Sequence, residues 1–195
     1  MEPIGGSVSV TWPAAWSADR TIRPMLLDEE SFHRLHARLA RPLLGYLRRF
    51  TGRDSAAQDL AQETWIKLLA TPVDASDPDR LRSFVFRVAT NLARDRFRRR
   101  RRESLFGLRP HREAEIAEPS QERAVEARDL ERCLQALRPR ERALVLLAHV
   151  EGFDHREIAG MLGLRPASVR VLLFRARKRL ARDLQRRGLA PRSGS

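Results

Sequence analysis

Six residues near the carboxyl end of the chain combine types and spacing suited to a nucleic-acid contact. Their spacing places them on one side of a helix: Ser168, Arg170, Val171, Phe174, Arg175 and Lys178. An Arg guanidinium binds phosphate through a planar fork and can also read guanine. A helix with such a basic outer face suits the major groove of duplex DNA.

The residues before this face predict how it is held. Asp154 and Glu157 form an acidic capping-box pattern at the start of a short helix, and Gly163 permits a tight turn. Pro166 suits the first position of a second helix, because its missing N–H costs nothing there. Residues 152–180 therefore predict a helix-turn-helix. The alternative is a plain amphipathic hairpin with a solvated basic face.

The composition favours a polyanionic partner. The 195 residues carry a net charge of +13 with a pI near 11.5, and most of the cations are Arg. Such an excess points to nucleic acid before a membrane surface. Cys133 stands alone, which excludes a disulfide framework and a cysteine-based metal site. Neither a signal peptide nor a membrane-spanning apolar run is recognisable, so we expect a cytoplasmic protein without membrane insertion.

The amino-terminal half reads as a tail followed by three helices. Residues 1–27 lack a sustained period and predict a mobile tail, with Trp12 and Trp16 as its exceptions. Helical spacing predicts helices over 28–50, 56–70 (capped by Asp54 or Ser55) and 81–102, with a loop over 71–82. The last helix ends in five arginines, 98–102, which repel one another unless a polyanion neutralises them. Phe84, Phe86 and Phe97 beside this run also suit unstacked bases.

The carboxyl-terminal half predicts a second helical unit. Residues 103–120 mix Gly, Pro, His and charges and predict a flexible linker. Helices are expected over 121–137 and 140–150, before the helix-turn-helix, and residues 188–195 predict a frayed end. The fold class expected is all-α, with two small helical domains, 28–102 and 121–187. Two weak modules on one tether can bind tightly together.

These motifs resemble a known family. AAQDLAQETWIKLL, LRSFVFRVATNLARDRFRRRRR and LRPRERALVLLAHVEGFDHREIAGMLGLRPASVRVLLFRARKRL are similar, in this order, to conserved regions of bacterial sigma-70 factors of the extracytoplasmic-function (ECF) group. The first resembles region 2.2, which binds the β′ clamp of core RNA polymerase. The second resembles regions 2.3 and 2.4, which melt and read the −10 element. The third resembles region 4, which docks on the β flap and reads the −35 element.

The resemblance implies roles for individual positions. Polymerase binding would fall to Asp59, Gln62 and Glu63, with Leu60 and Trp65 behind them, and to an apolar surface over 134–147. The −10 contacts would be Asn91, Arg94, Asp95 and Arg98, and the 71–82 loop would capture a flipped base. The −35 contacts would be the six residues named first. The resemblance also implies an anti-sigma factor as inhibitor, no cofactor and no metal.

The chain departs from the family pattern at several positions. Ala56 and Gln58 replace frequent acidic residues beside the clamp-binding face, and Phe84 stands where Trp is common. Arg165 occupies a position where Ser commonly caps the recognition helix. Val171 and Leu172 replace a polar and a basic residue, so one −35 contact is expected to be apolar, which suits a thymine methyl group.

Two other classes of function fit less well. A conventional helix-turn-helix regulator would need a dimer interface and two half-sites, and neither a coiled coil nor a ligand cavity is indicated. An enzyme is disfavoured because the five histidines are scattered without metal-ligand spacing, and no phosphate-binding glycine loop or nucleophile elbow occurs.

Overall fold

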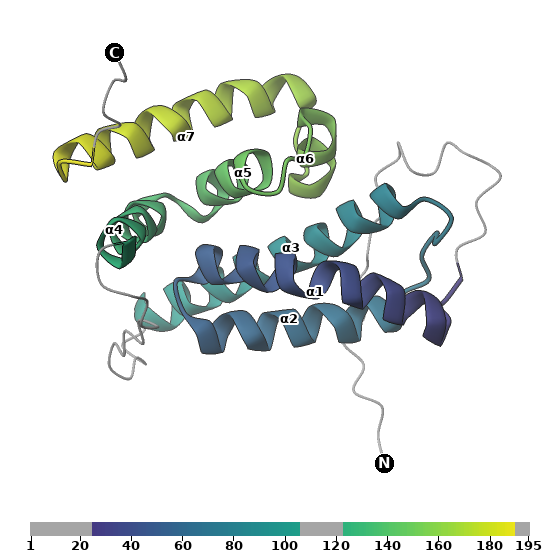
Figure 1. Cartoon of the computed structure of the whole chain (residues 1–195). Helices are drawn as coiled ribbons and strands as arrows, with labels where there is room; N and C mark the ends of the chain where they lie inside the picture. The colour runs from purple at the N-terminus through teal and green to yellow at the C-terminus, as the bar shows by residue number, and fades with distance from the viewer. Residues whose placement is uncertain (1–24, 106–122, 190–195) are drawn as a thin grey trace.

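The computed structural model describes residues 25–105 and 123–189, and within them it forms seven helices and one isolated bridge (Figure 1). The helices are α1 Glu29–Thr51, α2 Asp54–Leu69, α3 Pro78–Leu105, α4 Arg123–Ala136, α5 Pro139–His149, α6 His155–Leu162 and α7 Pro166–Arg186. The predicted all-α fold is confirmed.

Local capping chemistry explains where α1 and α2 begin and end. The Asp28 carboxylate accepts the Ser31 N–H at 2.8 Å, and Gly52 closes α1 with a left-handed φ of 66°. The predicted cap of α2 was wrong, because Arg53 occupies the N-cap position without a side-chain bond. Asp54 instead lies inside the first turn, where its negative charge interacts favourably with the helix dipole. Its carboxylate also pairs with Arg48 of α1 at 3.0 Å.

The long helix α3 starts earlier than the periodicity predicted. The Asp77 carboxylate accepts the N–H groups of Asp79 and Arg80, each at 3.0 Å, and so begins the helix at Pro78 rather than near Leu81. The helix runs to Leu105, so the arginines at 98–102 are helical and the predicted linker starts later than 103.

The described chain also begins earlier than predicted. Met25 exchanges two backbone hydrogen bonds with Val73, at 3.1 and 2.9 Å, so residues 25–27 are not part of a tail. Trp12, Trp16, most of the predicted linker and the last six residues lie outside the described ranges.

The helix-turn-helix forms as its local signals predicted. Asp154 accepts the N–H groups of Arg156 and Glu157, and the Glu157 carboxylate returns a bond to the Asp154 N–H at 2.8 Å. Gly163 closes α6 at a φ of 63°, a conformation that disfavours any side chain. Pro166 is the first residue of α7.

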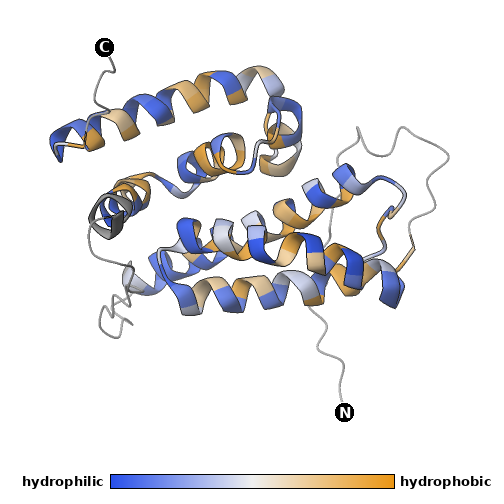
Figure 2. Cartoon of the chain, in the orientation of Figure 1, coloured by the Kyte–Doolittle hydropathy of each residue, from blue (hydrophilic) through white to orange (hydrophobic). Residues whose placement is uncertain are grey.

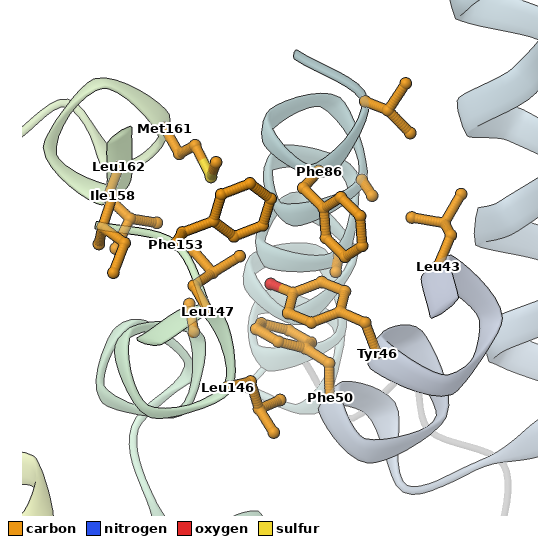
Figure 3. Close-up of a cluster of buried hydrophobic side chains, with 14 of the residues drawn as sticks. Leu43, Tyr46, Phe50, Phe86, Leu146, Leu147, Phe153, Ile158, Met161 and Leu162 are labelled. Atoms are coloured by element: carbon orange, nitrogen blue, oxygen red, sulfur yellow. The ribbon is translucent and has the colours of Figure 1, made fainter. Parts of the chain in front are cut away.

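The two helical units share one apolar core. α1, α2 and α3 pack side by side, and α4 to α7 form a second layer against α1 and α3 (Figure 1). Apolar faces of both layers turn inward (Figure 2), and buried side chains run continuously from Leu35 in α1 to Ala176 in α7. The two predicted helical units are both present, and in this arrangement they pack against each other (Figure 3).

The aromatic side chains of α3 belong to this core. Phe84 and Phe86 are buried, and Phe97 packs edge-on against Phe50 of α1, with ring centroids 5.8 Å apart. The prediction that these rings stack on unpaired bases was therefore wrong for this arrangement, because packing between the helices occupies them.

Candidate nucleic-acid and polymerase interface

One side of α7 is a continuous basic and apolar face. Arg170, Arg175 and Lys178 are exposed, and between them Val171 and Phe174 are 49% and 65% exposed. The opposite stripe is buried through Val169, Leu173 and Ala176. Five of the six predicted groove-facing residues thus share an open face, and the sixth, Ser168, is half-buried beside it.

The neighbouring helices hold this face rigidly. The Leu164 N–H donates to the Ala159 carbonyl at 2.8 Å, which fixes the turn between α6 and α7. Arg179 of α7 pairs with Glu141 of α5 at 3.5 Å. Arg165 is the N-cap of α7 and makes no side-chain cap bond, in line with its departure from the family pattern. Pro166 has no N–H, and the Ser168 N–H donates to the Arg165 carbonyl at 2.9 Å, so the first turn of α7 forms without a side-chain cap.

The second half of α3 carries the other basic face. Asn91, Asp95 and Arg98 are exposed at helical spacing, and Arg98 pairs with Asp95 at 3.3 Å. Arg94 is half-buried on the same helix. Burial lowers the pKa of Arg94, and nearby Arg98 and Arg140 lower it further. The phosphates of a nucleic-acid backbone would offset the repulsion between these cations.

The predicted polymerase-binding ridge lies on α2. Asp59, Gln62 and Glu63 are exposed on one face, while Leu60 is 1% exposed and supports them from within the core. Asp59 pairs with Arg96 of α3 at 3.1 Å, which fixes the ridge on α3.

An aromatic cluster supports the other end of the ridge. Trp65 is half-buried, and the centroid of its ring lies 4.8 Å from that of His36. The ring also meets Phe32 edge-on, with centroids 6.0 Å apart. These contacts join α2 to α1 and hold the ridge residues on a rigid pair of helices.

The apolar end of this ridge was not predicted from the sequence. Ile66 and Leu69 are 59% and 44% exposed. Ile66 follows Asp59, Gln62 and Glu63 at i+7, i+4 and i+3, so helical spacing alone could have assigned it to the same face. The exposed surface of α2 is therefore amphipathic rather than purely acidic and polar.

The predicted apolar docking surface over 134–147 is not accessible in this arrangement. Leu134, Leu137 and all residues from Arg142 to Leu147 are buried. Part of their cover is α1, because the Arg142 guanidinium donates to the Phe50 carbonyl. Contact with α1 therefore covers part of the surface that the resemblance assigns to the polymerase flap.

The described residues offer no metal site, since no three His, Cys, Asp or Glu side chains in the two ranges gather to hold an ion. None of the helices in those ranges has both the length and the apolar character needed to cross a membrane.

Comparison with known proteins decides the family. The profile of Sigma-70 region 2 matches residues 35–103, and that of Sigma-70, region 4 matches residues 127–180. The chain belongs to the sigma-70 family. It is 33% identical over 166 residues to the RNA polymerase sigma factor NccH of Alcaligenes xylosoxydans xylosoxydans, covering 81% of this chain and 89% of that one.

Further relatives place the chain in the ECF group. It is 33% identical over 137 residues to the ECF RNA polymerase sigma factor SigE of Mycolicibacterium smegmatis, covering 68% of this chain and 53%, about half, of SigE. The sigma factor RpoE of Bartonella quintana, solved with the anti-sigma factor NepR, has the same fold. It superimposes with a TM-score of 0.66 at 22% identity, over 80% of this chain and 98% of RpoE. The prediction of an ECF sigma factor rather than a stand-alone helix-turn-helix regulator is confirmed.

Proposed function

We propose that this ECF sigma factor binds core RNA polymerase and divides promoter recognition between its two basic helices. The outer face of α7 reads the −35 duplex through Arg170, Val171, Phe174, Arg175 and Lys178, with Ser168 at its edge. The carboxyl-terminal half of α3 contacts melted −10 DNA through Asn91, Arg94, Asp95 and Arg98. The chain supplies recognition and carries out no catalysis of its own.

The observation that carries this proposal is the open face of α7. Five side chains that can contact phosphates or base edges are exposed on one side, while the opposite side is buried against α5 and α6. A recognition helix held in this way enters a major groove without rearranging its own unit. The extra cations at the end of α3 support a second contact to the DNA backbone.

The exposed face of α2 is the proposed contact with the polymerase clamp. Asp59, Gln62 and Glu63 supply charge and hydrogen bonds, and Ile66 adds an exposed apolar side chain beside them. Leu60 and Trp65 act from beneath, because they hold α2 on the body of the first unit. We assign the β flap to the second unit, and an anti-sigma factor of the kind bound to RpoE as the inhibitor. All of these partners meet the chain in the cytoplasm.

Run-off transcription tests this function. Purified core polymerase is assayed with and without the chain on a library of upstream sequences, and the transcripts identify the promoter motif. We expect specific initiation only when the chain is present. Specific DNA binding without any gain in initiation would instead support a stand-alone regulator, which the proposal excludes.

A further inference from the structure

The segment before α1 is joined to the connection between α2 and α3, residues 70–77. The Met25 N–H donates to the Val73 carbonyl at 3.1 Å, and the Val73 N–H donates to the Met25 carbonyl at 2.9 Å. Figure 1 shows the segment beside this connection. Two parts of the chain that are far apart in sequence therefore form a single antiparallel bridge.

The backbone of Val73 depends on this bridge. The residue is only 2% exposed, and a buried N–H or C=O group that lacks a partner costs free energy. Met25 supplies the partner for both groups. Without the bridge, Val73 would keep two unpaired polar groups in the interior or would move outward, and the connection would change its shape.

The segment holds the connection through its backbone rather than its side chains. Met25 and Leu26 are 69% and 59% exposed, so neither side chain is part of the core. Leu27 packs against the core, and the Asp28 carboxylate accepts the Ser31 N–H at the start of α1. The segment is thus fixed directly after the bridge, and its backbone can hold the connection in place.

Other contacts fix the two ends of the connection. The Thr71 hydroxyl donates to the Lys67 carbonyl at 2.7 Å, and Arg38 of α1 donates to the Pro78 carbonyl at 2.8 Å. The residues that remain exposed between these ends are Pro72, Ala75 and Ser76. Because the bridge holds the middle of the connection, these exposed residues lie on a preformed surface.

This surface lies within reach of a DNA strand that follows α3. Asn91 comes 13 residues after Pro78, which is about 20 Å along the helix axis. About six nucleotides of one strand cover the same distance, at ~3.4 Å each. A melted strand on the −10 contacts of α3 therefore extends to the connection, where the resemblance implies that a flipped base is captured.

We propose that the backbone of Met25 positions the connection for capture of a −10 base, so the segment before α1 contributes to promoter selectivity. This inference rests on the proposed function and on the capture role that the resemblance implies for the connection. Extrusion of a base from the stack costs free energy. A connection that is already ordered adds nothing to this cost, whereas one that becomes ordered only at capture adds its lost conformational entropy.

Two substitutions at residue 25 separate the backbone from the side chain. Met25→Pro removes the N–H that donates to Val73, whereas the matched control Met25→Ala keeps it and removes only the exposed side chain. Circular dichroism and binding to core polymerase check that both variants keep the parent fold. Hydrogen exchange of the Val73 amide reports the bridge itself. We expect exchange to be about fivefold faster in Met25→Pro than in the parent chain or Met25→Ala, as for one lost hydrogen bond.

The functional readout is the binding of holoenzyme to single-stranded oligonucleotides with the −10 sequence found by run-off transcription. Each base is replaced in turn by an abasic site, and the captured position is the one where the parent chain loses most affinity. There we expect a loss of about tenfold for the parent chain and Met25→Ala but below about twofold for Met25→Pro, because ordering one backbone residue is equivalent to about tenfold in affinity. Losses at the other positions stay equal in all three chains.

Several results would overturn this positioning role. They are an unprotected Val73 amide in the parent chain, an undiminished abasic effect in Met25→Pro, and an equal change in Met25→Ala. Loss of core binding by Met25→Pro would also overturn it, because the segment would then support the whole unit rather than the connection. If the parent holoenzyme lost no affinity at any abasic position, the −10 role in the proposed function would fail and the inference with it, while the exchange rates would still show whether the bridge forms.

Discussion

The two basic helices of this protein, α7 and α3, differ in how much of their surface is buried. α7 buries a narrow stripe, through Val169, Leu173 and Ala176, and leaves the rest of its surface open. α3 is buried on most sides from Leu81 to Ala93 and becomes open and basic only in its second half. α7 therefore lies on the surface of the second unit, whereas α3 lies at the centre of the described helices.

This difference separates recognition from stability. A side chain on the outer face of α7 can be exchanged without loss of core packing. The DNA sequence that α7 prefers can therefore change without a loss of stability. On α3 the same chain segment supports α1, α2, α5 and α6. Substitutions in its first half therefore affect the fold and the contact between units before they affect DNA.

A matched pair of phenylalanines gives the largest expected contrast. Phe86 of α3 is fully buried between Tyr46 and Phe153, whereas Phe174 of α7 is 65% exposed. We expect Phe86→Ala to lower the free energy of unfolding by about 3–5 kcal/mol, because it leaves a cavity. Phe174→Ala should change it by less than ~0.5 kcal/mol. Urea unfolding followed by circular dichroism measures both, and equal losses would refute the contrast.

A pair of arginines gives the next contrast. Burial lowers the pKa of Arg142 to about 10, yet it stays protonated at neutral pH and donates to the carbonyls of Leu134, Gln135, Leu137 and Phe50. We expect Arg142→Met to lower the free energy of unfolding by about 2–3 kcal/mol, because buried carbonyls lose their donors. Arg175→Met, on the open face of α7, is the control and should leave it unchanged. An equal unfolding midpoint for the two variants would show that Arg142 is dispensable.

The same distinction explains what the sequence could predict. The start of α6, the turn at Gly163 and the start of α7 depend on neighbours within a few residues, and each was predicted correctly. The outer face of α7 followed from spacing alone, because nothing from the first unit covers it. Local chemistry was therefore sufficient for the helix-turn-helix, whereas it misplaced the cap of α2 and the start of α3.

Contacts between distant segments were not predictable in this way. Periodicity marked Phe86 as apolar but could not show that Phe153, 67 residues later, would cover it. Arg142 has no sequence signal for burial, since arginines are usually exposed. Its place follows from carbonyls at the ends of α1 and α4 that come together only when the units pack. The burial of the apolar residues over 134–147 could not be predicted for the same reason.

On the open face itself, Arg175 and Arg182 form a pair that tests recognition. Both are exposed on α7, but Arg182 lies seven residues further from the helix start, about 10 Å along the axis. We expect Arg175→Ala to weaken binding to a −35 duplex by about 1–2 kcal/mol, because it removes a contact near the groove. Arg182→Ala should have a smaller effect, equal for specific and unrelated duplexes.

Fluorescence anisotropy with both duplexes measures this difference, and a pull-down with core polymerase checks that Arg175→Ala retains core binding. If Arg175→Ala lost core binding to the same degree as DNA binding, α7 would be a polymerase contact rather than a reader of the −35 element.

The smallest expected effect concerns Val171, the apolar departure within a basic face. Its side chain is 49% exposed beside Phe174, and an exposed apolar group of this kind complements the methyl group of thymine rather than a hydrogen-bonding edge. Uracil differs from thymine only by that methyl, so replacing the −35 thymines one at a time isolates the contact. We expect one replacement to weaken binding by about 0.5–1 kcal/mol, the value of one buried methyl.

A double-mutant cycle identifies the side chain responsible. Val171→Ser removes both methyl groups of an exposed side chain and adds a hydroxyl, so the fold is preserved while the apolar contact is lost. If Val171 contacts the methyl, binding by Val171→Ser no longer distinguishes thymine from uracil at that position, although it still does so elsewhere. Phe174→Ala shows whether the neighbouring ring contributes to the same base. Full retention of the thymine preference in Val171→Ser would assign the preference to another residue of the α7 face.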